Sequence, residues 1–204
     1  CSSDLMTFAY ADPPYLGCGK RYVKEHPDAL IWDNPETHRQ LINRLLDEYP
    51  DGWALSASSP SLSRILSMCP EGYRVGAWVK PFAIFKPNVN PAFAWEPIIF
   101  FGGRRRTRQQ ETIRDWISCN ITLKKGLVGA KPPKVCKWIL EFLNVQSGDQ
   151  VDDLFPGTKI FSQVVQGLTD SPASGIPSRD PPQTHGGAVP RIKSEDFGPA
   201  GFVG

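Results

Sequence analysis

A short apolar run, residues 5–11, ends directly in Asp12-Pro13-Pro14-Tyr15. The run has the length and composition of a buried strand, and ligands of open α/β sheets bind beyond the carboxyl ends of such strands. The tetrapeptide suits a ligand that carries an amino group on a flat ring. Its carboxylate can accept a hydrogen bond, its prolines stiffen the loop and leave carbonyl groups free, and its tyrosine ring offers a stacking surface. An ordinary Asp-Pro turn is the alternative interpretation.

Apolar periodicity alternates between strands and helices along the first 168 residues. Asn34-Pro35 is a favourable helix start, because asparagine caps a helix and proline fits its first turn. The alternation predicts an α/β domain with a mainly parallel sheet and helices on both faces, and 204 residues are enough for one such domain. We expect strands at 5–11, 53–57, 74–79, 96–101 and 150–155, and helices at 35–49, 60–68, 132–143 and 158–167.

Three segments resemble motifs of one family. The tetrapeptide at 12–15 resembles the catalytic motif of S-adenosylmethionine-dependent amino-methyltransferases, which methylate exocyclic amino groups of adenine or cytosine in DNA. Residues 151–158 resemble the family's cofactor motif, and residues 129–132 resemble its Lys-Pro element. This order matches the permuted (beta-type) DNA methyltransferases, and residues 78–99 are similar to small phage and prophage methylases. The resemblance covers 5–168 and implies a Rossmann-like methyltransferase sheet with a circularly permuted motif order.

The resemblance also implies a mechanism. An exocyclic amine is a poor nucleophile because its lone pair is delocalised into the ring. Asp12 would accept one amino hydrogen, the Pro13 carbonyl would accept the other, and Tyr15 would stack on the base. Positioning would then supply much of the rate, and the base must first leave the duplex. The catalytic candidates are Asp12, Pro13, Pro14 and Tyr15, the implied cofactor is S-adenosylmethionine, and no metal is expected.

The implied cofactor site departs from the family at two points. Lys159 stands where a second glycine is usual, and its side chain could either crowd a sulfonium or extend into solvent. The acidic residue that usually ends the next strand has Asp170 as its nearby counterpart. Gly157 would allow close backbone approach, and the helix that follows would direct its N-terminus at polar ligand atoms. The cofactor candidates are Asp153, Phe155, Gly157, Thr158, Lys131 and Pro132.

Charge is distributed unevenly along the chain. The net charge is +2, yet the segment from Gly103 to Gly126 contains seven basic and two acidic residues, a surplus of +5. Beside a methyltransferase pocket, such a segment is interpreted as a small DNA-binding insert at about 103–126; a solvated loop is the alternative. The candidate DNA-binding residues are Arg104, Arg105, Arg106, Arg108, Lys124 and Lys125, while Gln109, Gln110 and Asn120 could read base edges.

The composition changes again at Thr169. Residues 169–204 contain six prolines and six glycines among 36 residues, with few large apolar side chains. Such a segment buries too little surface to offset its ordering entropy. We therefore expect a methyltransferase domain over 1–168 and a disordered tail over 169–204.

Other features narrow the function classes. The five cysteines are scattered and show neither a paired spacing nor a Cys/His metal spacing. This pattern suggests reduced thiols and hence a cytoplasmic location. If a phage encodes the chain, that location is the cytoplasm of the host cell. No run has the length of a membrane span, and no signal peptide is visible, so no membrane partner is expected. His38 is expected on a polar helix face and Trp32 is a candidate for base contact, whereas core positions are expected for Trp53, Trp78, Trp95, Trp116 and Trp138.

The combined interpretation is an S-adenosylmethionine-dependent DNA methyltransferase that acts on a flipped base of double-stranded DNA. By resemblance, Asp12 at the first motif position favours the exocyclic amine of adenine. Cytosine is the nearest alternative. A catalytically silent DNA-binding relic of the same fold is the alternative from another class.

Overall fold

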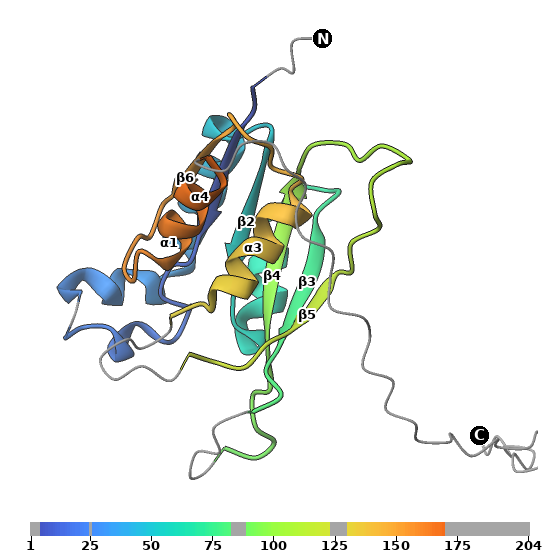
Figure 1. Cartoon of the computed structure of the whole chain (residues 1–204). Helices are drawn as coiled ribbons and strands as arrows, with labels where there is room; N and C mark the ends of the chain where they lie inside the picture. The colour runs from blue at the N-terminus through green and yellow to red at the C-terminus, as the bar shows by residue number, and fades with distance from the viewer. Residues whose placement is uncertain (1–4, 25, 83–88, 123–129, 170–204) are drawn as a thin grey trace, which may run out of the picture. The chain divides into compact units, whose positions relative to one another are not determined.

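A six-stranded sheet is the framework of the computed structural model (Figure 1). The structure describes residues 5–24, 26–82, 89–122 and 130–169. The strand order is β5-β3-β4-β2-β1-β6. The strands are β1 (Thr7–Ala11), β2 (Gly52–Ser56), β3 (Arg74–Val79), β4 (Trp95–Gly102), β5 (Trp116–Ser118) and β6 (Gln150–Asp153).

The pairing pattern shows that five of the six strands end at the same edge of the sheet. β1 is parallel to both β2 and β6, and β3 is parallel to β5. β4 is antiparallel to its two neighbours, β2 and β3. The strands β1, β2, β3, β5 and β6 therefore all end at the same edge, called here the carboxyl edge. β4 begins at that edge and ends at the opposite one.

Helices cover both faces of the sheet, as the alternation predicts. α1 starts at its expected place, because the Asn34 side chain accepts a hydrogen bond from the Glu36 amide and Pro35 occupies the first turn. The helices are α1 (Pro35–Glu48), α2 (Leu62–Leu66), α3 (Pro133–Phe142) and α4 (Ile160–Thr169), with short 3-10 turns η1 (Gly19–Arg21), η2 (Pro27–Asp33) and η3 (Ser59–Ser61).

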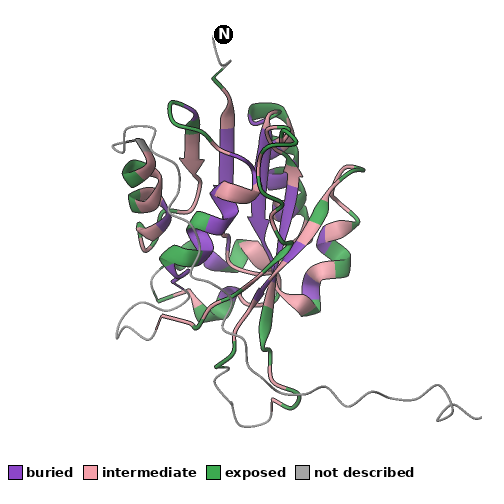
Figure 2. Cartoon of the chain, turned by 45° about the vertical axis from the view of Figure 1, so that its right-hand side comes forward, coloured by how far each residue is buried: buried purple, intermediate pink, exposed green. Residues whose placement is uncertain are grey.

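Two apolar cores lie on the two sides of the sheet. Phe8 and Tyr10 of β1 pack with α3 and with Phe161 of α4. Ala9 and Ala11 point to the other side, where they pack with α1. Strand residues alternate between faces, so a strand covered on both sides must be apolar throughout. Figure 2 shows the buried residues concentrated on the central strands between the helices.

The mixed α/β class and the mostly parallel sheet are confirmed, but some local expectations are wrong. β5 is an unpredicted strand of three residues. His38 is buried instead of exposed, because η2 covers that face of α1 and the His38 Nε2 atom lies 2.9 Å from the Trp32 carbonyl oxygen. Burial lowers the pKa of His38.

The predicted core tryptophans divide into two groups. Trp53, Trp78 and Trp138 are buried, as expected. Trp95 and Trp116 are 38% and 45% exposed, so the expectation is wrong for both. Trp95 opens β4, and Trp116 opens β5, which is the outermost strand of the described sheet. Apolar character alone does not distinguish the exposed first residue of a strand from a buried central one.

The predicted tail cannot be compared with the structure, since residues 170–204 lie outside the described residues. Its disorder and the boundary near 168 stay predictions. Among the described helices, none has the length and hydrophobicity needed to cross a membrane.

Gly76 provides a test of the packing between β3 and α3. A Cβ atom at this position would lie 2.8 Å from the Phe100 ring and 2.8 Å from the Trp138 ring. We expect Gly76→Ala to lower the free energy of unfolding by about 1–3 kcal/mol through overpacking. Gly167→Ala in α4 is the matched control: a Cβ there meets nothing within 4 Å, and helix propensity should raise stability by about 0.5–1 kcal/mol. Equal stabilities in urea denaturation would contradict this account of the packing.

Candidate functional site

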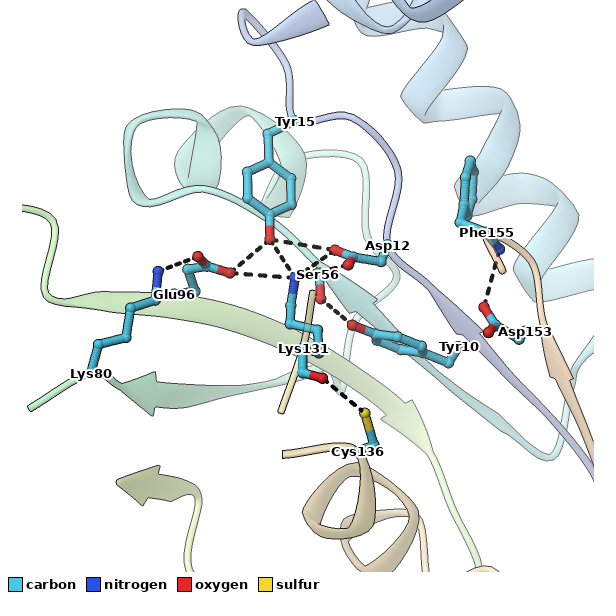
Figure 3. Close-up of polar contacts among 10 residues, drawn as sticks. All are labelled: Tyr10, Asp12, Tyr15, Ser56, Lys80, Glu96, Lys131, Cys136, Asp153 and Phe155. Atoms are coloured by element: carbon cyan, nitrogen blue, oxygen red, sulfur yellow. Dashed lines mark hydrogen bonds and ion pairs between the residues drawn. The ribbon is translucent and has the colours of Figure 1, made fainter. Parts of the chain in front are cut away.

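The Asp12 carboxylate lies at the carboxyl edge, directly after β1, and is bound by Lys131 (Figure 3). The Lys131 Nζ atom is 2.8 Å from Asp12 Oδ1 and 2.8 Å from Asp12 Oδ2. The same nitrogen is 3.0 Å from the Tyr15 hydroxyl oxygen and 3.4 Å from Glu96 Oε2. The ammonium group of Lys131 is thus surrounded by three oxygen-bearing side chains.

Glu96 joins this site from β4. Its Oε2 atom accepts a hydrogen bond of 2.8 Å from the Tyr15 hydroxyl, and its Oε1 atom pairs with Lys80, which directly follows β3. We call Asp12, Tyr15, Lys80, Glu96 and Lys131 the Lys131 cluster. Two carboxylates and two ammonium groups make its formal charge zero, which is the condition under which charges are tolerated away from water.

The electrostatics of the cluster define the protonation states. Burial alone would lower the pKa of Lys131. Asp12 and the other acidic groups around the ammonium outweigh this effect, so the pKa of Lys131 lies well above its usual value. Burial alone would raise the pKa of Glu96, yet Lys131 and Lys80 hold it below its usual value. Burial raises the pKa of Tyr15. At neutral pH Lys131 is therefore an ammonium, Glu96 a carboxylate and Tyr15 a neutral phenol.

The segment predicted as a cofactor motif lies at the same edge. Asp153 ends β6 and pairs in register with Tyr10 of β1, two residues before Asp12. Asp153 Oδ1 accepts a hydrogen bond of 3.2 Å from the Phe155 amide, and Oδ2 accepts one of 2.9 Å from Ser162. Burial raises the pKa of Asp153. The structure thus brings the N-terminal tetrapeptide and the 153–157 turn together on neighbouring strands.

The turn has space around its glycine. A Cβ atom at Gly157 would meet nothing within 4 Å, and Thr158 beside it is half-buried. Lys159 adopts a left-handed φ of 56°, a conformation that glycine adopts more readily than other residues. Its side chain is exposed. Of the two alternatives open from the sequence, the structure shows the one in which Lys159 extends into solvent.

Other predicted site residues have defined neighbours in the structure. Pro132 caps α3 and is buried, and Pro13 is buried in the loop after β1. Lys131 contacts Asp12, and its cofactor role stays a prediction. Trp32, predicted for base contact, packs edge-on against Phe155 with ring centroids 5.2 Å apart. The base-contact role of Trp32 and the cofactor role of Phe155 stay predictions.

The arginine run lies at the opposite edge of the sheet. Gly102 pairs with Gly52, the first residue of β2, so the chain after β4 emerges far from Asp12. Arg104 Nη2 lies 2.6 Å from Asp149 Oδ1, and Arg106 donates a hydrogen bond to the Glu141 carbonyl. These two arginines fasten the insert to the end of α3 and the following loop. Arg105 and Arg108 are exposed, while Lys124 and Lys125 lie outside the described residues.

Glu96 and Lys80 were not predicted as site residues. The available signal was weak: each is a charged residue at one end of a largely apolar strand, and each precedes a proline. Their partners are distant in sequence, so local pattern did not connect them to Asp12. In the described part of the chain, no group of three or more His, Cys, Asp or Glu side chains is placed to hold a metal ion.

The fold is that of S-adenosylmethionine-dependent methyltransferases. Its solved neighbours include M1.HpyAVI in complex with SAM, with a TM-score of 0.54, 16% identity and coverage of 80% of this chain and 79% of that chain. A second structure of M1.HpyAVI has a TM-score of 0.51, 16% identity and coverage of 81% and 78%. TTHA0409 from Thermus thermophilus, proposed to be a DNA modification methylase, has a TM-score of 0.47 and 16% identity, with coverage of 80% of this chain and 77% of that chain.

These likenesses concern structure, and the level of identity supports the fold alone. No family model matches the sequence, and no curated protein matches it.

Glu96 should make the stability of the protein sensitive to acid. The folded-state pKa of Glu96 is lowered from 4.5, so its stabilising contribution is fully present above about pH 4.5 and is lost as pH falls through the folded pKa. We expect Glu96→Gln to lower stability at pH 7 and to flatten the decline between pH 5 and 3, measured by urea unfolding. Glu48→Gln is the control, because Glu48 also forms an ion pair but is 49% exposed. A steep acid decline that survives in Glu96→Gln would contradict this role.

Arg104 should matter for folding irrespective of any ligand. Its partner Asp149 is 1% exposed, so Arg104→Ala would leave a buried carboxylate without this ion pair. We expect a loss of about 3 kcal/mol in unfolding free energy, whereas Arg105→Ala, at an exposed neighbouring position, should change it by less than about 0.5 kcal/mol. Thermal and urea unfolding of both variants would measure the difference, and similar losses would show that Arg104 is no anchor.

Proposed function

We propose that this protein is an S-adenosylmethionine-dependent DNA methyltransferase that methylates the exocyclic amino group of adenine in double-stranded DNA. One observation carries the proposal: Asp12, which shares Lys131 with Tyr15, follows β1 at the edge where β6 ends in the 153–157 turn, in a sheet with the methyltransferase fold. The arrangement puts an acceptor for an amine at the same edge as the segment that resembles a cofactor motif, and the Tyr15 side chain lies beside that acceptor.

Asp12 retains capacity for a substrate although Lys131 contacts both of its oxygens. An ionised carboxylate has about four lone-pair sites, and the Asp12 side chain is 22% exposed. By accepting an amino hydrogen, Asp12 would draw the nitrogen lone pair away from the ring, and the Pro13 carbonyl is our proposed second acceptor. After methyl transfer the nitrogen must release one proton, and the Asp12 carboxylate bound to that hydrogen is the base in reach.

Tyr15 is proposed to stack on the flipped base. Its hydroxyl is held by Glu96 and Lys131, which limits rotation of the ring and fixes the stacking surface. S-adenosylmethionine, when bound, supplies a methyl group on a positively charged sulfur. Asp153, Phe155, Gly157 and Thr158 are the residues proposed to hold it, and the open space at Gly157 and the exposed Lys159 side chain fit this assignment.

The finer assignments rest on the sequence resemblance. Asp12 at the first motif position favours adenine over cytosine, and the motif order favours the permuted type of enzyme with a phage or prophage origin. The exposed Arg105 and Arg108 are proposed to bind DNA phosphates. A cytoplasmic location is proposed from the cysteines, and Cys18, Cys69, Cys119 and Cys136 have free thiols in the structure.

A catalytically silent DNA-binding relic is the second candidate function. Among the described residues, β6 is the outermost strand on its side of the sheet. No further described strand presents the acidic residue that the family resemblance implies beside the cofactor. Asp170, the counterpart suggested by the sequence, lies outside the described residues.

Asp12→Ala tests the enzyme proposal. We expect transfer of a labelled methyl group from S-adenosylmethionine to unmethylated DNA to fall at least about 100-fold, while calorimetry shows the cofactor still bound. Asp47→Ala is the control, since Asp47 is an exposed aspartate on α1. A wild-type protein that releases no binding heat with S-adenosylmethionine would favour the silent relic. Transfer that survives in Asp12→Ala would refute the mechanism.

A further inference from the structure

Lys131 is the least exposed charged member of the Lys131 cluster. Its side chain is 7% exposed, compared with 22% for Asp12, 20% for Glu96 and 13% for Lys80. Solvent therefore reaches the Asp12 carboxylate more readily than the Lys131 ammonium. A ligand that approaches the carboxyl edge would meet the Asp12 carboxylate before it meets the Lys131 ammonium.

The contacts of Lys131 are directed at other side chains. An ammonium group has three hydrogens to donate and no lone pair, and its neighbours within 3.4 Å are oxygens of Asp12, Tyr15 and Glu96. The ammonium also lies 5.5 Å from the centre of the Tyr15 ring, a favourable cation–π distance. All three donors are thus used within the protein. A protonated Lys131 is also unable to act as a nucleophile for the methyl group.

Without the Lys131 ammonium, the carboxylates of Asp12 and Glu96 would share one site with less compensating charge. Asp12 and Glu96 both contact Lys131, and Asp153 stands on the neighbouring strand. Lys131 contacts both oxygens of Asp12, so it restrains rotation of that carboxylate as well as compensating its charge. Glu96 restrains the lysine in turn, and Lys80 compensates the second oxygen of Glu96.

We propose that Lys131 is a positioning residue, which orients the Asp12 carboxylate toward the target amine, and that Glu96 anchors Lys131 from β4. The inference rests on the proposed function and reassigns Lys131, which the sequence resemblance places in the cofactor site. Lys131 and Asp12 are 119 residues apart along the chain, so the motif alone does not reveal their contact.

Lys131→Met tests the assignment, because it keeps the length of the side chain and removes its charge. We expect kcat for methyl transfer to fall about 100-fold, an effect within the usual range for loss of organised acid–base groups, while the dissociation constant of S-adenosylmethionine changes less than threefold. Lys134→Met is the control, since Lys134 is exposed and lies three residues further along the chain, in the first turn of α3. Asp153→Ala should show the reverse pattern, with weakened cofactor binding.

A cofactor dissociation constant weakened more than tenfold in Lys131→Met would overturn the proposal in favour of the cofactor role, and an unchanged kcat would overturn it outright. If that variant fails to fold, Glu96→Gln provides the same test with an uncharged isostere: kcat should fall at least tenfold with cofactor binding retained, and unchanged kcat would remove Glu96 as the anchor.

A crystal structure of Lys131→Met separates this inference from the proposed function, because it does not depend on activity. The Asp12 carboxylate should rotate from its wild-type orientation while the backbone of 12–15 stays in place. An unmoved carboxylate would overturn the positioning role even in an active enzyme. A rotated carboxylate in a protein that proves inactive would leave the positioning role intact and reject the enzyme assignment.

Discussion

The ion pair between Asp12 and Lys131 is the interaction on which the arrangement of the candidate site depends. It joins the loop after β1 to the segment that leads into α3, two parts of the chain separated by 119 residues. A buried ammonium is costly without partners, so this contact requires two carboxylates and a phenol to be brought to one place. The fold brings these partners together, and their balanced charges in turn allow the ammonium to stay buried.

The reversed direction of β4 is what makes this balance possible. Since β4 is antiparallel to β2 and β3, its first residues lie at the edge where the other strands end. Glu96, the second residue of β4, reaches Tyr15 and Lys131 for that reason. Its partner Lys80 arrives from the end of β3. A parallel strand in this place would bring its final residues to the site and carry Glu96 to the opposite edge.

Local chemistry predicts much of this structure, and long-range contact accounts for what it misses. The Asn34 cap, the helix that starts at Pro35 and the buried strand before Asp12 follow from neighbouring residues, and all three appear where expected. The partners of Lys131 and Arg104 lie on other elements, so sequence pattern did not reveal their contacts with Asp12 and Asp149. The burial of His38 was missed for the same reason, because the periodicity of α1 does not show that η2 covers this face of the helix.

The fastening of the insert by Arg104 and Arg106 has an evolutionary consequence. These arginines contact Asp149 and Glu141 at one end of the sheet, and the Lys131 cluster occupies the other. Substitutions at Arg104 and Arg106 should alter how much folded protein a cell accumulates while leaving the reactive centre as it was. Selection on protein abundance and selection on chemistry would then act on separate sets of positions. The amount of folded protein could therefore change in evolution without a change in the reactive centre.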